Sequence, residues 1–280
     1  MSRISELFTF PVTDRSLPWK SIIDKQYCEY TSKRCFKVRK SEPEISIGTC
    51  VVKYGRDPED IIICPHRLLQ RNQIFFDCIH LLALHQPGNE LHVIPEVGIP
   101  GGNVDYFLVS TDEKRKINDF VGIELQTMDT TGTVWPERQL CLYELGLIPE
   151  EPQVDKLFGM NWKMTAKTIL VQLHHKIQTF QSLNKHLVLV VQDPLLRYIE
   201  KEFSFEHIHK NPLLGDSMHF HSYNLMELDN RYKLKLESRF STDSEGISRL
   251  LGLKANANVE LEEILSILQS KISDATLLRL

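Results

Sequence analysis

Two apolar segments of strand length lie close together near the middle of the 280-residue chain: VDYFLVS (residues 104–110) and FVGIELQTMD (residues 120–129). An acid interrupts each segment, Asp105 in the first and Glu124 in the second. Burying an unpaired carboxylate is very costly, so each acid needs a partner, a proton or a metal ion. Both the fold and the chemistry predicted for this chain depend on which of these compensates the two acids.

The residues around this pair predict three consecutive strands. The segment NELHVIPEVGI (89–99) also has strand composition, and PGGN (100–103) forms a turn between it and the strand that carries Asp105. The polar stretch TDEKRKIND (111–119) predicts a hairpin loop before the strand that carries Glu124. Neighbouring strands would therefore carry the two acids.

Further apolar patterns predict an α/β fold. The run HLVLVVQ (186–192) is typical of a strand buried on both faces, and Asp193 with Pro194 is expected to open a helix, with Asp193 as its cap. The other predicted elements are helices over 66–85, 163–181 and 258–272, and strands over 218–225 and 232–238. This order favours a mixed central sheet flanked by helices.

Composition divides the chain into a front module and a core. Residues 1–65 are rich in cysteine, charge and short extended pieces, which predicts an irregular N-terminal module. We expect the core to span residues 66–280, with an inserted loop region around 128–161, where Trp135 and several prolines interrupt the pattern.

The overall charge and the N-terminus limit the classes of function. Lysine and arginine number 33 against 37 acids, so the net charge is 33 − 37 = −4, which argues against a basic protein that coats nucleic acid. The N-terminus lacks the pattern of a secretory signal, and no apolar run approaches the length of a membrane span. We therefore expect a cytoplasmic protein with no membrane association, whose six cysteines are reduced.

Asp105 and Glu124 are candidate ligands of a magnesium ion. Two converging carboxylates repel each other unless a cation lies between them, and oxygen ligands suit Mg²⁺. Gln126 returns to the same strand face as Glu124, and Glu96 on the preceding strand is a candidate third carboxylate. The alternative is that Asp105 begins a strand near a turn, Glu124 forms a salt bridge, and Gln126 is an ordinary polar residue.

The same residues resemble the PD-(D/E)XK nuclease motif. Asp105 stands at the first acid, and Glu124, Leu125 and Gln126 stand at the (D/E)XK element. The segment GIELQTMDTTG (122–132) is specifically similar to the active-site region of NotI-like type II restriction endonucleases, in which glutamine also replaces the usual lysine. One departure is Val104, which stands where proline commonly precedes the first acid. The other is Gln126 itself, which cannot supply positive charge and can only form hydrogen bonds.

The resemblance implies a PD-(D/E)XK nuclease core and site-specific, Mg²⁺-dependent cleavage of double-stranded DNA at a palindromic sequence. It implies that Asp105, Glu124 and the backbone carbonyl of Leu125 hold Mg²⁺, that Gln126 positions the nucleophile, and that Glu96 helps to bind a second ion. A palindromic target would be matched by a two-fold homodimer. The alternatives are a nuclease of the same superfamily outside restriction, and a catalytically silent DNA-binding protein on the same scaffold.

Four cysteines precede the core. Cys28, Cys35, Cys50 and Cys64 are separated by six, fourteen and thirteen residues, which leaves open a metal site or scattered buried thiols. The resemblance favours metal, because NotI-like enzymes carry a four-cysteine iron site in this region. Four thiolates suit Fe or Zn equally well, and we expect a structural role. Cys78 and Cys141 are expected to be core residues.

Residues that contact DNA are less clearly indicated. The segment 130–161 contains Arg138 and Lys156 and could approach DNA, and Lys163 and Lys167 are candidate phosphate contacts; the alternative for each is a solvated surface charge. His219 and His221 share a strand face, but surface or core histidine is the favoured interpretation for every histidine.

Overall fold

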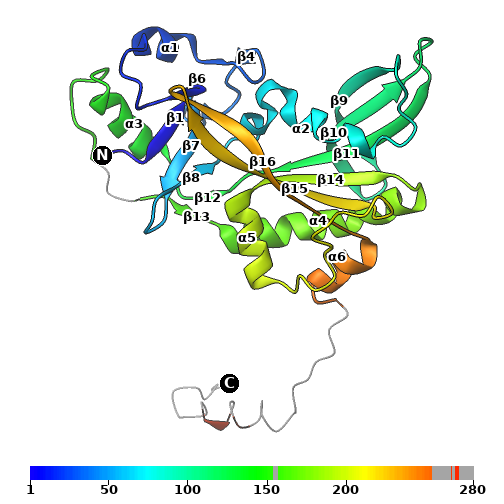
Figure 1. Cartoon of the computed structure of the whole chain (residues 1–280). Helices are drawn as coiled ribbons and strands as arrows, with labels where there is room; N and C mark the ends of the chain where they lie inside the picture. The colour runs from blue at the N-terminus through cyan, green and yellow to red at the C-terminus, as the bar shows by residue number, and fades with distance from the viewer. Residues whose placement is uncertain (154–156, 254–265, 267–268, 271–280) are drawn as a thin grey trace.

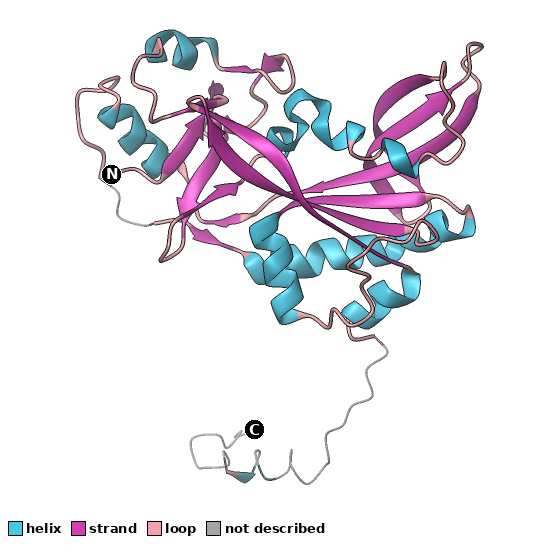
Figure 2. Cartoon of the chain, viewed as in Figure 1, coloured by secondary structure: helices cyan, strands magenta, loops and turns pink. Residues whose placement is uncertain are grey.

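A six-stranded mixed β-sheet forms the centre of the molecule, which we describe from a computed structural model covering residues 1–153, 157–253, 266 and 269–270 (Figures 1 and 2). Its strands are β9 (Glu90–Ile99), β10 (Gly102–Thr111), β11 (Ile117–Gln126), β14 (His186–Gln192), β15 (Met218–Leu228) and β16 (Arg231–Thr242). They lie in the order β16-β15-β14-β11-β10-β9. The pairs β11–β14 and β14–β15 are parallel, and the other neighbours are antiparallel. The predicted α/β fold with a mixed central sheet is confirmed.

Helical segments cover both faces of this sheet (Figure 2). One face carries α4 (Trp162–Ser182), α5 (Asp193–Glu202) and α6 (Ser244–Leu250); the other carries the 3₁₀ segments η1 (Pro65–Asn72) and η2 (Ile79–Leu81) and the short helix α2 (Gln73–Phe76). Leu189 of β14 belongs to the first apolar core and Val188 to the second, and both are 0% exposed. The continuous apolar run of β14 therefore reflects burial on both faces.

The predicted helix over 66–85 is wrong, because this segment forms three short pieces. Arg71 and Asn72 have φ values of 53° and 57°, in the left-handed region that a right-handed helix cannot contain. These two residues end η1 and redirect the chain into α2. The helical spacing of apolar residues was real, since Leu68, Ile74 and Phe75 are buried, but it belongs to separate turns.

Residues 1–65 are more regular than expected. They contain α1 (Trp19–Lys25) and a four-stranded antiparallel sheet in the order β2-β1-β7-β8. The strands of this sheet are β1 (Ile4–Leu7), β2 (Phe10–Pro11), β7 (Thr49–Tyr54) and β8 (Glu59–Ile62). Two small ladders complete the region: β3 (Tyr27–Cys28) with β4 (Lys33–Arg34), and β5 (Val38–Arg39) with β6 (Glu42–Ser46).

Hydrogen bonds fasten this N-terminal sheet to the central one. The Gln192 side chain at the end of β14 accepts from Ile62 N at 2.7 Å through Oε1 and donates to Asp60 O at 2.6 Å through Nε2. Ile62 O accepts from Met128 N at 3.2 Å, two residues beyond the end of β11. The side chain of Gln192 thus takes the place that a further strand would take beside β8.

The other connections correct details of the sequence prediction. The insertion contains α3 (Trp135–Glu144) and the pair β12 (Thr130–Thr131) with β13 (Gly159–Met160). Helix α5 begins at Asp193, but its carboxylate pairs with Arg197 at 2.6 Å and makes no side-chain cap. Helix α6 was not predicted, and the predicted helix over 258–272 lies largely outside the described residues. No helix in the described ranges is long and apolar enough to cross a membrane.

Candidate functional site

Asp105 and Glu124 lie side by side on β10 and β11. The antiparallel register pairs Tyr106 with Ile123, which places the two acids at the next positions along the ladder. Asp105 is half-buried, and its Oδ2 accepts a hydrogen bond from Leu125 N at 2.8 Å. Glu124 is buried at 3% exposure, on the face that α4 covers. The structure therefore brings the two predicted acids together.

Lys176 of α4 lies beside the two acids, and it was not among the residues predicted from the sequence. Its Nζ lies 2.7 Å from Glu124 Oε1, and the lysine is 5% exposed. Helix α4 buries Leu173, Ile177 and Phe180 on the same face. A lysine three residues after Leu173, within that apolar stripe, is the signal that could have identified it. The cation that Gln126 cannot supply is present, but it comes from a helix 52 residues further along the chain.

The protonation of Glu124 reflects burial opposed by this lysine. Burial is the largest cause that raises its pKa, and the negative charge of Asp105 raises it further, whereas the hydrogen bond and charge of Lys176 lower it. The net result is a Glu124 pKa raised from 4.5 to about 7. The carboxyl can therefore exchange a proton near neutral pH.

The turn between β9 and β10 rests directly on α4 beside Lys176. Gly101 has a φ of 99°, and a Cβ at this position would lie 2.3 Å from the backbone oxygen of His175. Gly102 lies over the lysine, since a Cβ there would be 3.3 Å from Lys176 Cε. The two glycines allow the hairpin to approach the helix, which fixes Asp105 relative to Lys176.

Gln126 and Glu96 differ in how far they match the prediction. Gln126 is half-buried, and its Nε2 donates to Thr127 O at 2.6 Å. Glu96 is exposed, with a φ of 52°, and the register of β9 on β10, in which Pro95 pairs with Tyr106 and Val97 with Val104, places it opposite Asp105. The described part of the chain contains no group of three or more His, Cys, Asp or Glu side chains placed to hold a metal ion, so the role of Glu96 in binding a second ion stays a prediction.

The four predicted cysteines surround one small cavity. Cys28, Cys35, Cys50 and Cys64 are buried and line a space of about 10 Å³, although their spacing does not form a metal-holding group among the residues described. They come from β3, the loop after β4, β7 and the residue that precedes η1. The front module thus brings together thiols that are up to 36 residues apart in sequence, because 64 − 28 = 36.

Backbone N–H groups point at three of these sulfurs. Cys35 accepts from the backbone of Lys37 and Gly48, Cys50 from that of Thr9, and Cys64 from His66 and Arg67. Cys50 also donates to Cys64, and this hydrogen bond is the largest cause that lowers the Cys64 pKa, against the effect of burial. Burial is the largest cause that raises the pKa of Cys35, and the hydrogen bond that Cys50 donates to Cys64 is the largest cause that raises the pKa of Cys50. The donors therefore favour the thiolate form that metal binding requires at Cys64, whose pKa is lowered to about 7.

The remaining cysteines are core residues, as predicted, and the buried histidines lie in the core, each with one ring nitrogen that has no hydrogen-bond partner among the described residues. Cys141 is 2% exposed, and Cys78 lies 3.7 Å from His221 Nδ1 in the second apolar core. His219 Nε2 is bonded to Asp216 O at 2.9 Å, and burial lowers the His219 pKa to about 4. Burial also lowers the pKa of His221. Both histidines are therefore neutral at pH 7.

The basic residues predicted to contact DNA differ in their exposure. Arg138 is buried at 3% exposure and donates to Ile47 O at 2.6 Å, so the prediction that it approaches DNA is wrong. It holds α3 against the N-terminal module instead. Lys163 and Lys167 are exposed on α4. Lys156 lies outside the described residues.

Two comparisons of the chain with known proteins found no match. No family model matches the chain, and no curated protein matches it.

Proposed function

We propose that the protein is a site-specific deoxyribonuclease that hydrolyses phosphodiester bonds in double-stranded DNA, as a PD-(D/E)XK type II restriction endonuclease does. One observation carries the proposal: Asp105, Glu124 and Lys176 meet on a buried face, with Nζ of the lysine 2.7 Å from the Glu124 carboxylate. Two acids and one cation on this scaffold are the groups that phosphodiester hydrolysis needs. Lys176 supplies the charge that is missing at Gln126.

The oxygen donors at this site suit Mg²⁺. Mg²⁺ in proteins is usually held by one or two carboxylates together with water and substrate phosphate. Asp105 and Glu124 would hold the ion, together with the backbone carbonyl of Leu125, the residue after Glu124. When bound, Mg²⁺ supplies Lewis acidity at the phosphodiester and activates water.

The protein's own groups have separate roles in the proposed reaction. The Lys176 ammonium opposes the effect of burial on Glu124 and favours its ionised form, and it stabilises negative charge that develops on the phosphate. Gln126 can orient the attacking water through its amide oxygen, since the Nε2 group is bonded to Thr127 O. Leu125 N holds the Asp105 carboxylate in place at 2.8 Å.

We assign the four cysteines to a structural iron or zinc ion. The support is their convergence on one buried cavity and the backbone N–H groups directed at Cys35, Cys50 and Cys64. Soft thiolate ligands suit both metals. A bound ion would tie β3, β7 and β8 together in a region of the chain with short strands. The reduced thiols this needs agree with the cytoplasm as the proposed location.

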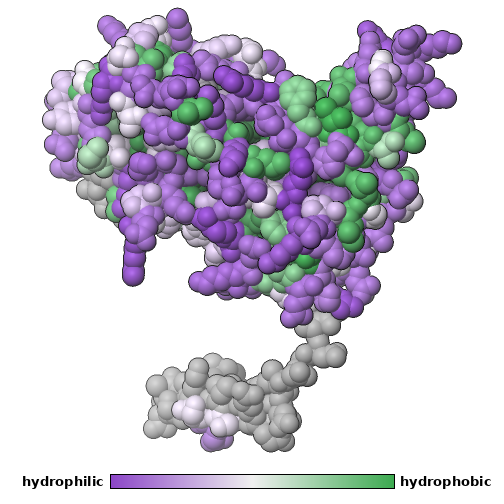
Figure 3. Space-filling view, viewed as in Figure 1, coloured by the Kyte–Doolittle hydropathy of each residue, from purple (hydrophilic) through white to green (hydrophobic). Residues whose placement is uncertain are grey.

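A homodimer on a palindromic duplex is the proposed assembly. Edge strand β9 exposes Leu91, Val93 and Ile94, each more than a third exposed. Figure 3 shows apolar side chains gathered on the side of the molecule that carries α2, β9 and β10. Exposed apolar patches of this kind are typical of protein interfaces, and two-fold symmetry would let each subunit cut one strand.

Incubation with phage DNA and Mg²⁺ tests the proposed function. Discrete fragments would support a restriction endonuclease, a smear would indicate a non-specific nuclease, and uncut DNA that shifts on a gel would indicate a silent binder. Asp105→Asn and Glu124→Ala should abolish cleavage, whereas Glu113→Gln, an exposed acid in the β10–β11 loop, should retain it. Cleavage by a clean Asp105→Asn preparation would refute the assignment.

A further inference from the structure

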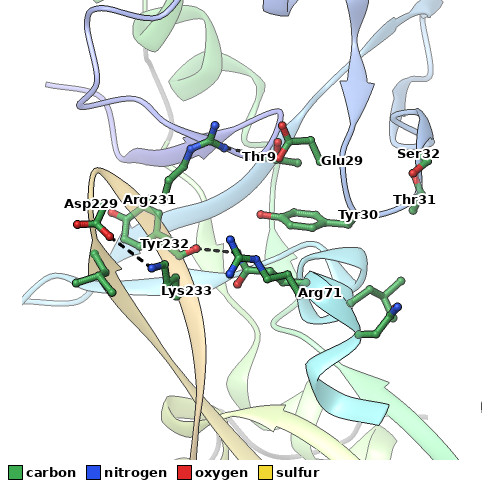
Figure 4. Close-up of a pocket in the computed structure, with 14 residues that line it drawn as sticks. Thr9, Glu29, Tyr30, Thr31, Ser32, Arg71, Asp229, Arg231, Tyr232 and Lys233 are labelled. Atoms are coloured by element: carbon green, nitrogen blue, oxygen red, sulfur yellow. Dashed lines mark hydrogen bonds and ion pairs between the residues drawn. The ribbon is translucent and has the colours of Figure 1, made fainter. Parts of the chain in front are cut away.

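A second site lies away from the acid pair, in a cavity of about 790 Å³ (Figure 4). Its walls come from four parts of the chain: Thr9 in the turn between β1 and β2, the turn that joins β3 to β4, the junction between η1 and α2, and the tip of the β15–β16 hairpin. The volume falls in the range of roughly 300–1,000 Å³ that is typical of ligand sites. Polar side chains dominate the lining, including Thr9, Tyr30 and Tyr232.

Hydrogen bonds hold two of these walls together. Arg67 and Gln70 of η1 both donate to Tyr232 O, at 2.9 and 2.8 Å, and Gln70 Oε1 accepts from Leu234 N at 2.9 Å. Arg67 is 0% exposed and is fixed by an ion pair with Glu6 at 3.0 Å. Because these bonds join η1 to the hairpin beneath the cavity, the space is set by the fold and does not depend on surface side chains.

Three cations face this cavity from opposite sides. Figure 4 shows Arg231 and Lys233 on the hairpin and Arg71 on the other wall. Arg71 is exposed in a left-handed conformation, with φ 53°, and forms no ion pair within the described ranges. This backbone conformation turns the residue out of η1 at the rim of the cavity.

The two acids in the lining are held only loosely. Arg231 lies 3.6 Å from Glu29, and Lys233 lies 3.6 Å from Asp229, both beyond hydrogen-bond length. Exposed ion pairs of this kind contribute little to stability, so the N–H groups of Arg231 and Lys233 remain available to a stronger acceptor. Three cations against two carboxylates leave one net positive charge, three minus two. Thr9 adds a buried hydroxyl with no hydrogen-bond partner among the described residues.

We propose that this cavity binds a phosphate group of a DNA strand, outside the site of hydrolysis. Arg71 makes the principal contact, and Arg231 and Lys233 approach the phosphate from the hairpin. A phosphate oxygen is a better acceptor for guanidinium than a carboxylate 3.6 Å away, because it permits short, charge-assisted hydrogen bonds. The choice of DNA as the source of the phosphate rests on the proposed function.

The salt dependence of DNA binding tests this proposal. Binding of a fluorescein-labelled duplex is measured by anisotropy without added divalent cation, over a range of salt concentrations. Each phosphate contact contributes about 0.9 to the slope of log K against log salt. Arg71→Gln should therefore reduce the slope by about 0.9, and Arg71→Lys should restore it. The control is Arg56→Gln, an exposed arginine in the β7–β8 turn outside the cavity, which should leave the slope unchanged. Thermal melting confirms that the variants fold.

The outcomes separate this proposal from the proposed hydrolysis. A slope that is unchanged in Arg71→Gln overturns the cavity proposal, even if the protein cuts DNA. An Arg71-dependent slope supports it, even if the wild type cuts nothing. Inorganic phosphate added to the protein without DNA tests the other source of the ligand, free phosphate. If it raises the melting temperature of the wild type but not of Arg71→Gln, while the duplex does not bind, the proposal of a DNA strand is overturned.

Discussion

The acid site and the cysteine cavity both bury ionisable groups, but they differ in how a negative charge on those groups is compensated. At Glu124, burial raises the pKa to about 7 and a single cation, Lys176, opposes it. In the cysteine cavity the pKa values of Cys35 and Cys50 are raised, and that of Cys64 is lowered to about 7 by the hydrogen bond from Cys50, by backbone N–H groups and by the charge of Lys37, against burial. The Glu124 carboxylate thus contacts its cation directly, whereas Lys37 in the lining of the cysteine cavity donates to Ile63 O at 3.2 Å and faces four thiols. The comparison indicates that the cysteine cavity has the greater need for a metal ion.

Removing a cysteine ligand should therefore have the largest effect on the protein. Cys50→Ser should lose the bound iron or zinc and lower the melting temperature sharply, because metal binding at structural sites contributes on the order of 10 kcal/mol to folding. Elemental analysis and calorimetry measure the two quantities. Cys141→Ser, a buried cysteine outside the cavity, should keep the metal. Wild-type protein that contains neither metal would contradict the assignment.

Replacing Lys176 should have an intermediate effect. Lys176→Met leaves Glu124 buried without its cation, and breaking a buried ion pair in this way costs about 3–5 kcal/mol. Loss of a preorganised charge at the reacting phosphate should also reduce kcat by about 10²–10³. Denaturant unfolding and single-turnover cleavage measure the two effects. Lys167→Met, exposed on the same helix, is the matched control, and wild-type turnover in Lys176→Met would exclude a role for the lysine.

The pH dependence of stability should show the smallest of the three effects. The folded protein binds the Glu124 proton more tightly than the unfolded chain does, since the Glu124 pKa rises from 4.5 to about 7. This contribution to stability is fully present below pH 4.5 and is lost as the pH rises through about 7. Melting curves recorded over a range of pH without divalent cations measure this contribution. In Glu124→Gln, the slope of the unfolding free energy against pH should change by at most about 1.4 kcal/mol per pH unit. Identical profiles for the two proteins would show that Glu124 does not titrate in this range.

Local pattern was enough to predict the strands and the acid pair. The run of β14 is apolar throughout because both its faces are buried, and an acid inside an apolar strand is conspicuous wherever it occurs. The polar stretch 111–119 between the two runs was enough to predict that neighbouring strands carry the acids. The four cysteines could be named as candidates for the same reason, since buried thiols on strand ends are visible in the sequence.

Tertiary packing decided the features that the sequence analysis missed. Lys176 looked like one basic residue on a long helix, and its contact with Glu124 depends on how α4 lies across the sheet. Arg138 looked like a surface charge, but α3 docks on the N-terminal module and buries it against Ile47 O. The helix expected over 66–85 failed because two non-glycine residues, Arg71 and Asn72, adopt a left-handed backbone that composition does not reveal.

The side chain of Gln192 bears on whether the N-terminal region can be separated from the rest. Ile62 N and Asp60 O find their partners on Gln192, and Ile62 O finds its partner at Met128 N. Cutting the chain near residue 65, or transplanting residues 1–65 to another scaffold, would leave backbone groups at this seam without partners, at about 1–3 kcal/mol for each buried group. The boundary visible in the composition is therefore not a line along which the protein can be divided, and the central sheet has to be expressed and engineered together with the cysteine-bearing N-terminal region.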